Sequence, residues 1–316
     1  PATARFDSMP RSAIESGCVD ITADPADMPR AIAGWVLDPV QGRHFSTPDS
    51  PALVQQTGPY GHVLTLLQSA FDIDFEHYKP GTIVRRIERR LGIGTTPLTP
   101  EDYAERLAGS RAELDRLFSD LLIGVTRFFR EPHHFDHLIE TVLAPRADKV
   151  RAGQPLRIWS SACSTGQEPY SLALAVLSVW PNAHELDIKI LATDIDANVV
   201  RTAKAGVYTS EAIEQIPANY RNRWMAKDPD SARTWRMGEE ARSLIAFNTL
   251  NLIGEWPMKK KLDAIFCRNV VIYFDEPTQA KLWQRFKALL APTGRLYVGH
   301  SERVGDAAFE SDGQTV

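Results

Sequence analysis

The stretch "LRIWSSACSTGQEPYSLALAVL" at residues 156–177 decides the fold class of this chain. It opens on a short apolar run, 156–159, that is typical of a buried strand. It ends on a longer apolar run, 168–177, that is typical of a buried helix. Mostly small residues and a single glycine, Gly166, lie between the two. A strand that leads through a short loop into a helix predicts one unit of a parallel α/β sheet.

The same alternation continues along the chain. Three more apolar strand candidates follow, at 187–194, 262–269 and 294–301. Helical stretches separate the strands, at 168–180, 196–205 and 276–290. This order predicts an α/β fold with a parallel sheet. The order breaks at about 207–250, where three short polar-alternating segments ("RNRWMAK", "ARTWRMG" and "ARSLIAFNTL") predict a small antiparallel β insertion.

The part of the chain before this sheet has a different character. Residues 1–58 are rich in Pro, Ser and Asp and predict a linker with one short helix at 26–37. From residue 60 the apolar residues recur three and four apart, which predicts helices. These helices are expected at 60–71, 81–91, 100–108, 111–123 and 131–143. We therefore expect three parts: a linker at 1–58, a small all-α domain at 59–143 and an α/β domain at 144–316.

The overall composition excludes several classes of protein. The chain has 316 residues and a net charge of −4, so no overall positive field attracts it to nucleic acid. Its three cysteines, Cys18, Cys163 and Cys267, are far apart and odd in number, which predicts no disulfide framework and a reducing compartment. No apolar run is long enough to insert into a membrane. We expect a cytoplasmic protein.

Polar residues follow three of the predicted strands, where ligands bind in open parallel sheets. They are Glu168, Asp194 and Asn269. A dinucleotide needs a glycine-rich loop around its phosphates, whereas this loop has one glycine and then an acid that repels phosphate. The sulfonium, the amino group and the ribose hydroxyls of S-adenosylmethionine suit these acids better. Taken singly, Glu168 is also explained as a helix-dipole cap, and Asp194 as part of a turn.

Other reactive side chains give weaker signals. No histidine lies close in sequence to Cys163, so a small buried cysteine is expected there rather than a nucleophile. His133, His134 and His137 lie on a polar helical stretch and are expected to be solvated, with no metal bound.

Several segments together resemble the chemotaxis receptor methyltransferases, the CheR family. In chain order they are "FDIDFEHYKPGTIVRRIERRL" (71–91), "VTRFFREPHHF" (125–135), "RIWSSACSTGQEPYSLA" (157–173), "LATDID" (191–196), "FNTLNL" (247–252), "DAIFCRNVVIYFD" (263–275) and "GRLYVGHSE" (294–302). The resemblance covers roughly residues 60–302 in consistent order.

The resemblance implies a Rossmann-like methyltransferase domain with a small β insertion, preceded by a small all-α domain. It implies transfer of a methyl group from S-adenosylmethionine to glutamate side chains on the cytoplasmic domain of chemoreceptors, with S-adenosylhomocysteine as product. It implies Arg130 and Tyr273 beside the transferred methyl group. The cofactor contacts that it implies are Thr126, Arg130, Glu168, Asp194, Asn251, Leu252 and Asn269.

The arginine-rich helix carries four arginines in two i,i+4 pairs, Arg85 with Arg89 and Arg86 with Arg90. By itself such a face is explained as a solvated surface. With the resemblance it indicates a cationic surface for acidic receptor helices. This favours a protein substrate over the alternative of a small-molecule methyltransferase.

The chain departs from the family pattern at two positions near these motifs. Gly124 stands where the family often has Asn, and Gln167 replaces the first of two usual acids. Both departures motivate an alternative function, a catalytically weak sensory adaptor that binds cofactor or receptor. In addition, residues 7–28 resemble the tail of the chemotaxis methylesterase (CheB) family. This resemblance predicts that the chain derives from a methylesterase–methyltransferase fusion, and the alternative is a chance match in a linker.

Overall fold

The computed structural model describes residues 26–29, 58–71, 73–92, 98–122, 124–229, 231, 233–305 and 309–310. The chain divides into two compact units, Pro1–Pro51 and Ala52–Val316. Most of the expected linker, its short helix and the segment that resembles the methylesterase tail lie outside the described residues. The account below concerns the second unit.

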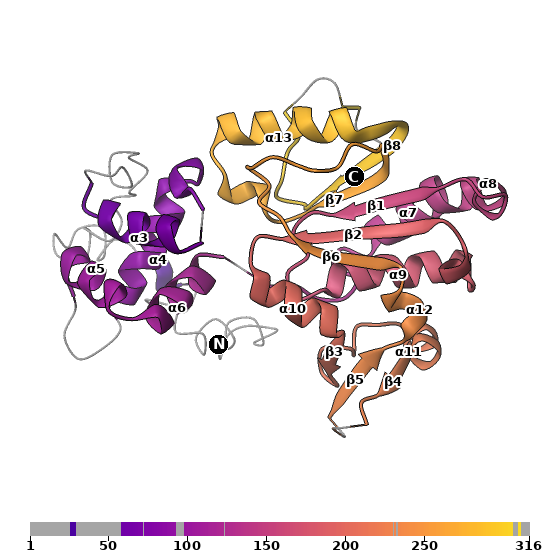
Figure 1. Cartoon of the computed structure of the whole chain (residues 1–316), viewed down its shortest axis with the longest axis horizontal. Coiled ribbons are helices and arrows are strands. Elements are labelled where there is room, and N and C mark those ends of the chain that lie inside the picture. The colour runs from indigo at the N-terminus through magenta and orange to yellow at the C-terminus, as the bar shows by residue number, and fades with distance from the viewer. Residues whose placement is uncertain are drawn as a thin grey trace. The chain divides into compact units, whose positions relative to one another are not determined.

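A five-stranded parallel sheet, in the order β6–β2–β1–β7–β8, forms the centre of this unit (Figure 1). Its strands are β1 (Leu156–Ser160), β2 (Ile188–Asp194), β6 (Ile245–Thr249), β7 (Leu262–Cys267) and β8 (Leu290–Val298). The predicted parallel sheet is thus confirmed, and its four predicted strands overlap β1, β2, β7 and β8. The fifth strand, β6, was expected elsewhere.

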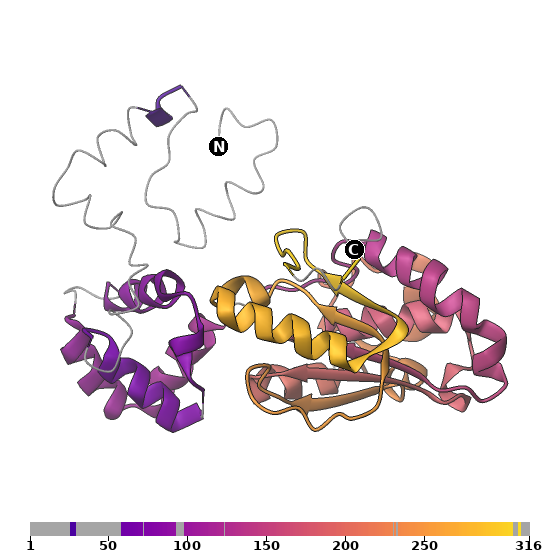
Figure 2. The same cartoon turned by 90° about the horizontal axis from the view of Figure 1, so that it is seen from above.

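Neighbouring residues of the central strands pack on opposite faces of the sheet, because side chains alternate along a strand. On one face, Ile158 and Phe266 belong to a core with helix α9 (Gln167–Val179). On the other face, Trp159 and Ile265 belong to a core with helix α13 (Glu276–Leu289). Helix α13 also packs against β8 (Figure 2). A sheet covered on both faces explains why the predicted strands are almost wholly apolar.

The helical segment at 131–143 packs on the α9 side of this sheet. It forms α7 (His133–Leu138) and the π-helical segment η4 (Ile139–Leu143). Its apolar side chains share a core with β1 and α9. From the sequence we expected this segment to belong to the small all-α domain at 59–143, whereas its side chains pack with the sheet. Three further helical segments border the sheet: η5 (Ala144–Arg146), α8 (Ala147–Arg151) and η6 (Ala183–Glu185).

A small antiparallel sheet with the order β3–β5–β4 lies between β2 and β6 in sequence, which confirms the predicted insertion (Figure 1). Its parts are β3 (Val207–Thr209), α11 (Ala218–Trp224), β4 (Met225–Lys227), β5 (Thr234–Met237) and α12 (Glu239–Arg242). The third segment assigned to this insertion, "ARSLIAFNTL", was placed wrongly. It forms β6, which pairs in parallel with β2 and packs Ile245 and Phe247 against Val200.

The helices before the sheet form a bundle, and side chains cap the N-termini of two of them. They are α3 (Gly61–Phe71), η3 (Phe75–His77), α4 (Pro80–Leu91), α5 (Pro100–Ala108) and α6 (Arg111–Leu121). Thr99 and Asp102 make a reciprocal capping box at the start of α5, and Ser110 caps α6. Contact with the α/β part is made around Tyr78, whose ring packs edge-on to that of Phe274 at 4.9 Å between centroids. No helix among the described residues has the length and apolarity that crossing a bilayer requires.

Candidate active site

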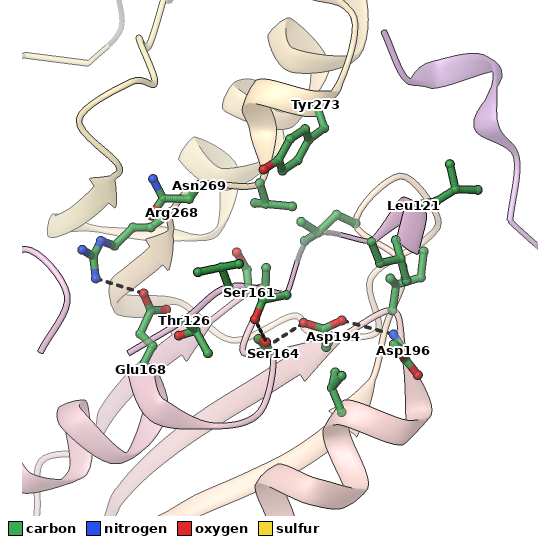
Figure 3. Close-up of a pocket in the computed structure, with 18 of the residues that line it drawn as sticks. Leu121, Thr126, Ser161, Ser164, Glu168, Asp194, Asp196, Arg268, Asn269 and Tyr273 are labelled. Atoms are coloured by element: carbon green, nitrogen blue, oxygen red, sulfur yellow. Dashed lines mark hydrogen bonds and ion pairs between the residues drawn. The ribbon is translucent and has the colours of Figure 1, made fainter. Parts of the chain in front are cut away.

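A cavity of about 400 Å³ lies beyond the carboxyl ends of β1, β2, β6 and β7 (Figure 3). This is the edge at which open parallel sheets bind ligands. All eight pocket residues expected from the sequence line it: Thr126, Arg130, Glu168, Asp194, Asn251, Leu252, Asn269 and Tyr273. They come from five separate stretches of the chain, which the sheet topology brings to one place.

The loop after β1 reaches the pocket through a turn that only glycine fits well. Gly166 has a φ of 99°, and a Cβ atom there would lie 2.7 Å from the Tyr208 hydroxyl and 2.8 Å from Ala203 Cβ. Helix α9 begins directly after this glycine and has Glu168 in its first turn. The single glycine of the loop therefore allows its turn and the close approach of β3 and α10 (Ala197–Ala205).

Glu168 is held in a largely buried position at the sheet edge. Its Oε1 accepts a hydrogen bond from Ser160 Oγ at 2.8 Å. Its Oε2 accepts one from Arg268 Nη1 at 3.1 Å, which Figure 3 shows as a dashed line. Burial raises the pKa of the Glu168 carboxyl above its ordinary value, while the charge of Arg268 opposes that rise. A buried carboxylate of this kind favours a cationic group in the pocket.

Asp194 ends β2 and is oriented by the backbone around it. Its Oδ2 accepts from the Ser164 N–H at 2.8 Å, and its Oδ1 accepts from the Asp196 N–H at 3.1 Å (Figure 3). Burial raises the pKa of this carboxyl, although these backbone donors oppose the rise. Asp196 then caps α10 by accepting from the Asn198 N–H at 2.7 Å. The turn predicted as the alternative therefore exists, and Asp194 lines the pocket as well.

Asn269, Tyr273 and Arg130 lie on the side of the pocket formed by the loop after β7 and the loop after α6. The Asn269 Oδ1 atom is buried and has no hydrogen-bond partner among the described residues. Burial raises the pKa of the Tyr273 hydroxyl, while the charges of Arg86 and Arg130 oppose that rise. Arg130 Nη1 also donates to the carbonyl oxygen of Val125 at 3.0 Å. The orphan acceptor of Asn269 fits a ligand that donates hydrogen bonds.

Backbone strain is concentrated around this pocket. Within the described residues, the four non-glycine residues with positive φ are Phe129 (48°), Glu131 (55°), Ser164 (48°) and Asn269 (58°). Ser164 and Asn269 line the pocket, and the other two flank Arg130. Left-handed backbone at such residues is disfavoured unless its surroundings fix it, and it is typical of functional sites.

Arg268 is the main pocket residue that sequence reasoning missed. Its side chain is 2% exposed and bridges Glu168 to Glu131, whose Oε2 lies 2.8 Å from Arg268 Nη2. It also donates to the carbonyl oxygen of Arg130. Burial by itself would raise the pKa of the Glu131 carboxyl. Hydrogen bonds from Arg268 and His300 outweigh burial and lower this pKa to about 2. Its position directly before Asn269 was the available sequence signal.

The four arginines of α4 lie in different environments. Arg85 and Arg89 are exposed and Arg86 is half-buried near Tyr273. Arg90 instead packs inside the helical bundle, with its Nε 2.6 Å from Asp120 Oδ2 and its Nη1 3.2 Å from Glu113 Oε1. The expectation that all four present charge to a substrate is therefore wrong for Arg90, because two carboxylates of α6 already pair with it.

Two of the weaker signals resolve clearly. Cys163 is buried as predicted, and burial raises the pKa of its thiol. Cys267 is also buried and free. His134 contradicts the prediction of a solvated histidine: it is fully buried, and its Nδ1 lies 3.5 Å from Glu131 Oε2. The helix α7 turns this side chain toward the sheet together with Phe135.

The two departures from the family pattern also have different consequences. Gln167 does not line the pocket, and its Oε1 accepts from Thr165 Oγ1 at 2.8 Å. Gly124 does line the pocket, and a Cβ atom there would lie 3.3 Å from Ser164 Oγ. The Gln167 replacement thus lies away from the ligand position, which weakens the case for an adaptor.

The pocket fits S-adenosylmethionine in size and in chemistry. Its volume lies in the usual range for small-molecule sites, and its polar lining includes three carboxylates (Glu168, Asp194 and Asp196) and a buried amide acceptor. These groups match a ligand with an ammonium, a sulfonium and ribose hydroxyls. Glu168 and Asn269 would face its cationic end, and Asp194 its ribose.

Comparisons with known proteins agree with this geometry. Residues 124–315 match the family described as "CheR methyltransferase, SAM binding domain". Residues 60–122 match "CheR methyltransferase, all-alpha domain". The boundary between the two matches falls at the end of α6, close to the start of the pocket-lining segment 124–130.

Several relatives carry corresponding names. The chain is 50% identical over 210 residues to a "Probable chemotaxis protein methyltransferase" of Rhizobium etli, covering 66% of this chain and 78% of that protein. It is 39% identical to "Chemotaxis protein methyltransferase 2" of Pseudomonas aeruginosa, covering 77% and 86%. It is 33% identical to the "Chemotaxis protein methyltransferase" of Escherichia coli, covering 81% and 89%.

Proposed function

Because the chain belongs to the CheR methyltransferase family, we propose that it methylates glutamate side chains on the cytoplasmic domain of chemoreceptors, with S-adenosylmethionine as methyl donor. The observation that supports this proposal is one pocket that brings buried acids and a buried amide acceptor together with Arg130 and Tyr273. The acids suit a cationic methyl donor, and the arginine and tyrosine suit a carboxylate acceptor.

For methyl transfer to a carboxylate, the main task of the protein is to position the two reactants. When bound, S-adenosylmethionine supplies an electrophilic methyl group on a sulfonium and leaves as S-adenosylhomocysteine. A substrate glutamate has a pKa of roughly 4.3 and is ionised at neutral pH, so no general base is needed. Arg130 steers this carboxylate with a charge-assisted hydrogen bond, and Tyr273 donates a neutral one. Burial keeps the Tyr273 hydroxyl protonated and able to donate.

We assign the cofactor contacts to the same residues that the sequence indicated. Glu168 and Asn269 bind the amino-acid end, Asp194 binds the ribose, and Thr126, Asn251 and Leu252 complete the walls. Arg268 joins this set as a positioning residue, since it fixes the Glu168 carboxylate and the carbonyl group of Arg130.

The substrate side of the proposal rests on α4. Arg85, Arg86 and Arg89 present positive charge, which attracts acidic receptor helices. Arg86 is placed to act nearest the reacting carboxylate, because its charge acts on Tyr273. Arg90 has no part in this surface.

We also propose that the chain derives from a larger fused protein of the cytoplasm. It is 31% identical, over 96% of its length, to one third of a 104.1 kDa protein of Rhodobacter capsulatus. That alignment necessarily extends through most of residues 1–57, upstream of the family matches. A methylesterase domain as the fusion partner is favoured by the resemblance of residues 7–28.

Two measurements test the proposed function. Calorimetric titration with S-adenosylhomocysteine should give binding to the wild type that Asp194→Ala removes. Incubation with radiolabelled S-adenosylmethionine and a chemoreceptor cytoplasmic fragment should then give base-labile methyl esters. Binding without methyl transfer would favour the adaptor, and no binding by a folded wild type would contradict the methyltransferase.

A further inference from the structure

A carboxylate outside the pocket, that of Glu302, binds the loop on which the pocket residues Asn269 and Tyr273 lie. Glu302 follows β8 and is 8% exposed. Its Oε2 accepts from the N–H of Asn269 at 2.7 Å and from the N–H of Gly299 at 2.6 Å. Its Oε1 accepts from the N–H of Val270 at 2.9 Å and from that of Val271 at 2.8 Å. One side chain thus pairs with four backbone donors.

Three of these donors belong to consecutive residues, Asn269 to Val271. Successive N–H groups converge on one acceptor at helix N-termini and in nests that include a left-handed residue, and here Asn269 has a left-handed φ of 58°. The segment η7 (Val271–Tyr273) starts at the last of the three donors. The carboxylate therefore stabilises a strained loop whose first residue is Asn269 and whose last turn ends at Tyr273.

Gly299 completes the arrangement from the β8 side. A Cβ atom on Gly299 would lie 2.5 Å from Asn269 Nδ2 and 2.9 Å from Asn269 Cγ. No other residue type leaves room for this amide. Glu302 thus fixes the backbone of Asn269, while Gly299 allows its side chain to take the position in which Oδ1 is buried at the pocket.

We propose that Glu302 is a positioning residue for methyl transfer, acting through the Asn269–Tyr273 loop. The inference rests on the proposed function, since it assumes that Asn269 contacts the cofactor. Glu302 does not line the pocket and touches no reacting atom. It sets the orientation of the Asn269 amide and, through η7, the place of the Tyr273 hydroxyl.

The first test is Glu302→Gln, which keeps the size and one acceptor oxygen but points an NH₂ group at two N–H donors. We expect S-adenosylhomocysteine affinity to fall about 10-fold or more, the range for losing hydrogen bonds to a charged group. We also expect kcat to fall, because Tyr273 is displaced. Glu310→Gln, at an exposed glutamate, is the matched control and should leave both values unchanged.

A double-mutant cycle with Asn269→Ala distinguishes positioning from general stabilisation. If Glu302 acts through Asn269, then Glu302→Gln causes little further loss of affinity once the Asn269 amide is gone. A merely structural role predicts the same fold-loss in both backgrounds. That additive result would overturn the inference.

Gly299→Ala tests the same arrangement without removing the carboxylate, should Glu302→Gln not fold. Its methyl group must displace the flexible Asn269 amide, so we expect weaker S-adenosylhomocysteine binding by a folded protein. Wild-type affinity in Gly299→Ala or Glu302→Gln would overturn the positioning role and leave the proposed function standing. No binding by the wild type itself would overturn both.

Discussion

The main-chain N–H of Lys79 donates a hydrogen bond to the carbonyl oxygen of Tyr273 at 2.9 Å. This bond joins the residue that precedes α4 to a residue that lines the pocket. The arginine-rich helix therefore starts directly beside the Asn269–Tyr273 loop. A receptor carboxylate that reaches Tyr273 comes under the influence of Arg86, whose charge already acts on this tyrosine.

Replacing Arg86 should impair recognition of the receptor and spare the cofactor. We expect Arg86→Ala to lower kcat/KM for a receptor fragment by about 10-fold at low salt, because a positive charge that attracts the substrate beside Tyr273 is lost. The difference from the wild type should shrink as salt is raised, since screening acts over about 10 Å at 0.1 M. Arg151→Ala, on α8, is the control. An equal loss of S-adenosylhomocysteine affinity would contradict a substrate role.

The two residues assigned to the reacting carboxylate should differ in importance. Arg130→Ala removes a charged donor, and we expect turnover to fall about 10²-fold, as for one preorganised donor. Tyr273→Phe removes a neutral donor and keeps the ring, so the loss should be smaller. Both variants should be compared by single-turnover methyl transfer with saturating cofactor. Wild-type turnover in a folded Arg130→Ala would contradict the assignment.

Much of the fold was predictable because strongly buried strands leave a clear apolar pattern. β1 and β7 are covered on both faces, and their sequences are nearly continuous apolar runs. β6 was misplaced because it is an edge strand with alternating exposure, which resembles the strands of the antiparallel insertion. The pairing of β6 with β2 joins residues about 55 positions apart in the sequence, and no local sequence pattern indicates such a pairing.

The pocket residues at strand ends were predictable for a similar reason, since topology places all carboxyl ends at one edge. The supporting network was not predictable from the chain alone. Arg268 pairs with Glu131, which lies 137 positions away in the sequence, and Glu302 binds the N–H of Asn269, which lies 33 positions away. The inward turn of Arg90 likewise depends on carboxylates of α6. Pairings of distant charges become visible only when the chain is folded.

Removing the Asp194 charge should lower the affinity for S-adenosylhomocysteine and leave the stability of the fold nearly unchanged. Burial raises the pKa of this carboxyl, which means that the fold disfavours its ionised form. We therefore expect Asp194→Asn to change the melting temperature by no more than a few degrees. Affinity for S-adenosylhomocysteine should fall about 10-fold or more, because one acceptor for the ribose is lost.

Calorimetry and thermal melts of the same Asp194→Asn sample measure both quantities. Asp136→Asn, at an exposed aspartate on α7, is the control and should alter neither. Unchanged affinity in Asp194→Asn would show that this carboxylate faces no ligand.

Because of Glu131, the free energy of unfolding should decrease as the pH falls below 5. Burial raises the pKa of the Glu131 carboxyl, but hydrogen bonds from Arg268 and His300 outweigh this effect and lower the pKa from 4.5 to about 2. A carboxyl with a lowered folded-state pKa stabilises the fold above its unfolded pKa, and this contribution is lost as pH falls toward the folded value.

Glu131→Gln removes this contribution, so its difference in unfolding free energy from the wild type should be largest above pH 5. The difference should shrink steadily as the pH falls from 4.5 toward 3, and denaturant titrations at each pH measure it. His300→Ala keeps the Arg268 contact at 2.8 Å and should show a weaker effect of the same sign. A difference that stays constant over this range would mean that Glu131 has the same pKa in the folded and unfolded chain, and that its pairing with Arg268 adds nothing to stability.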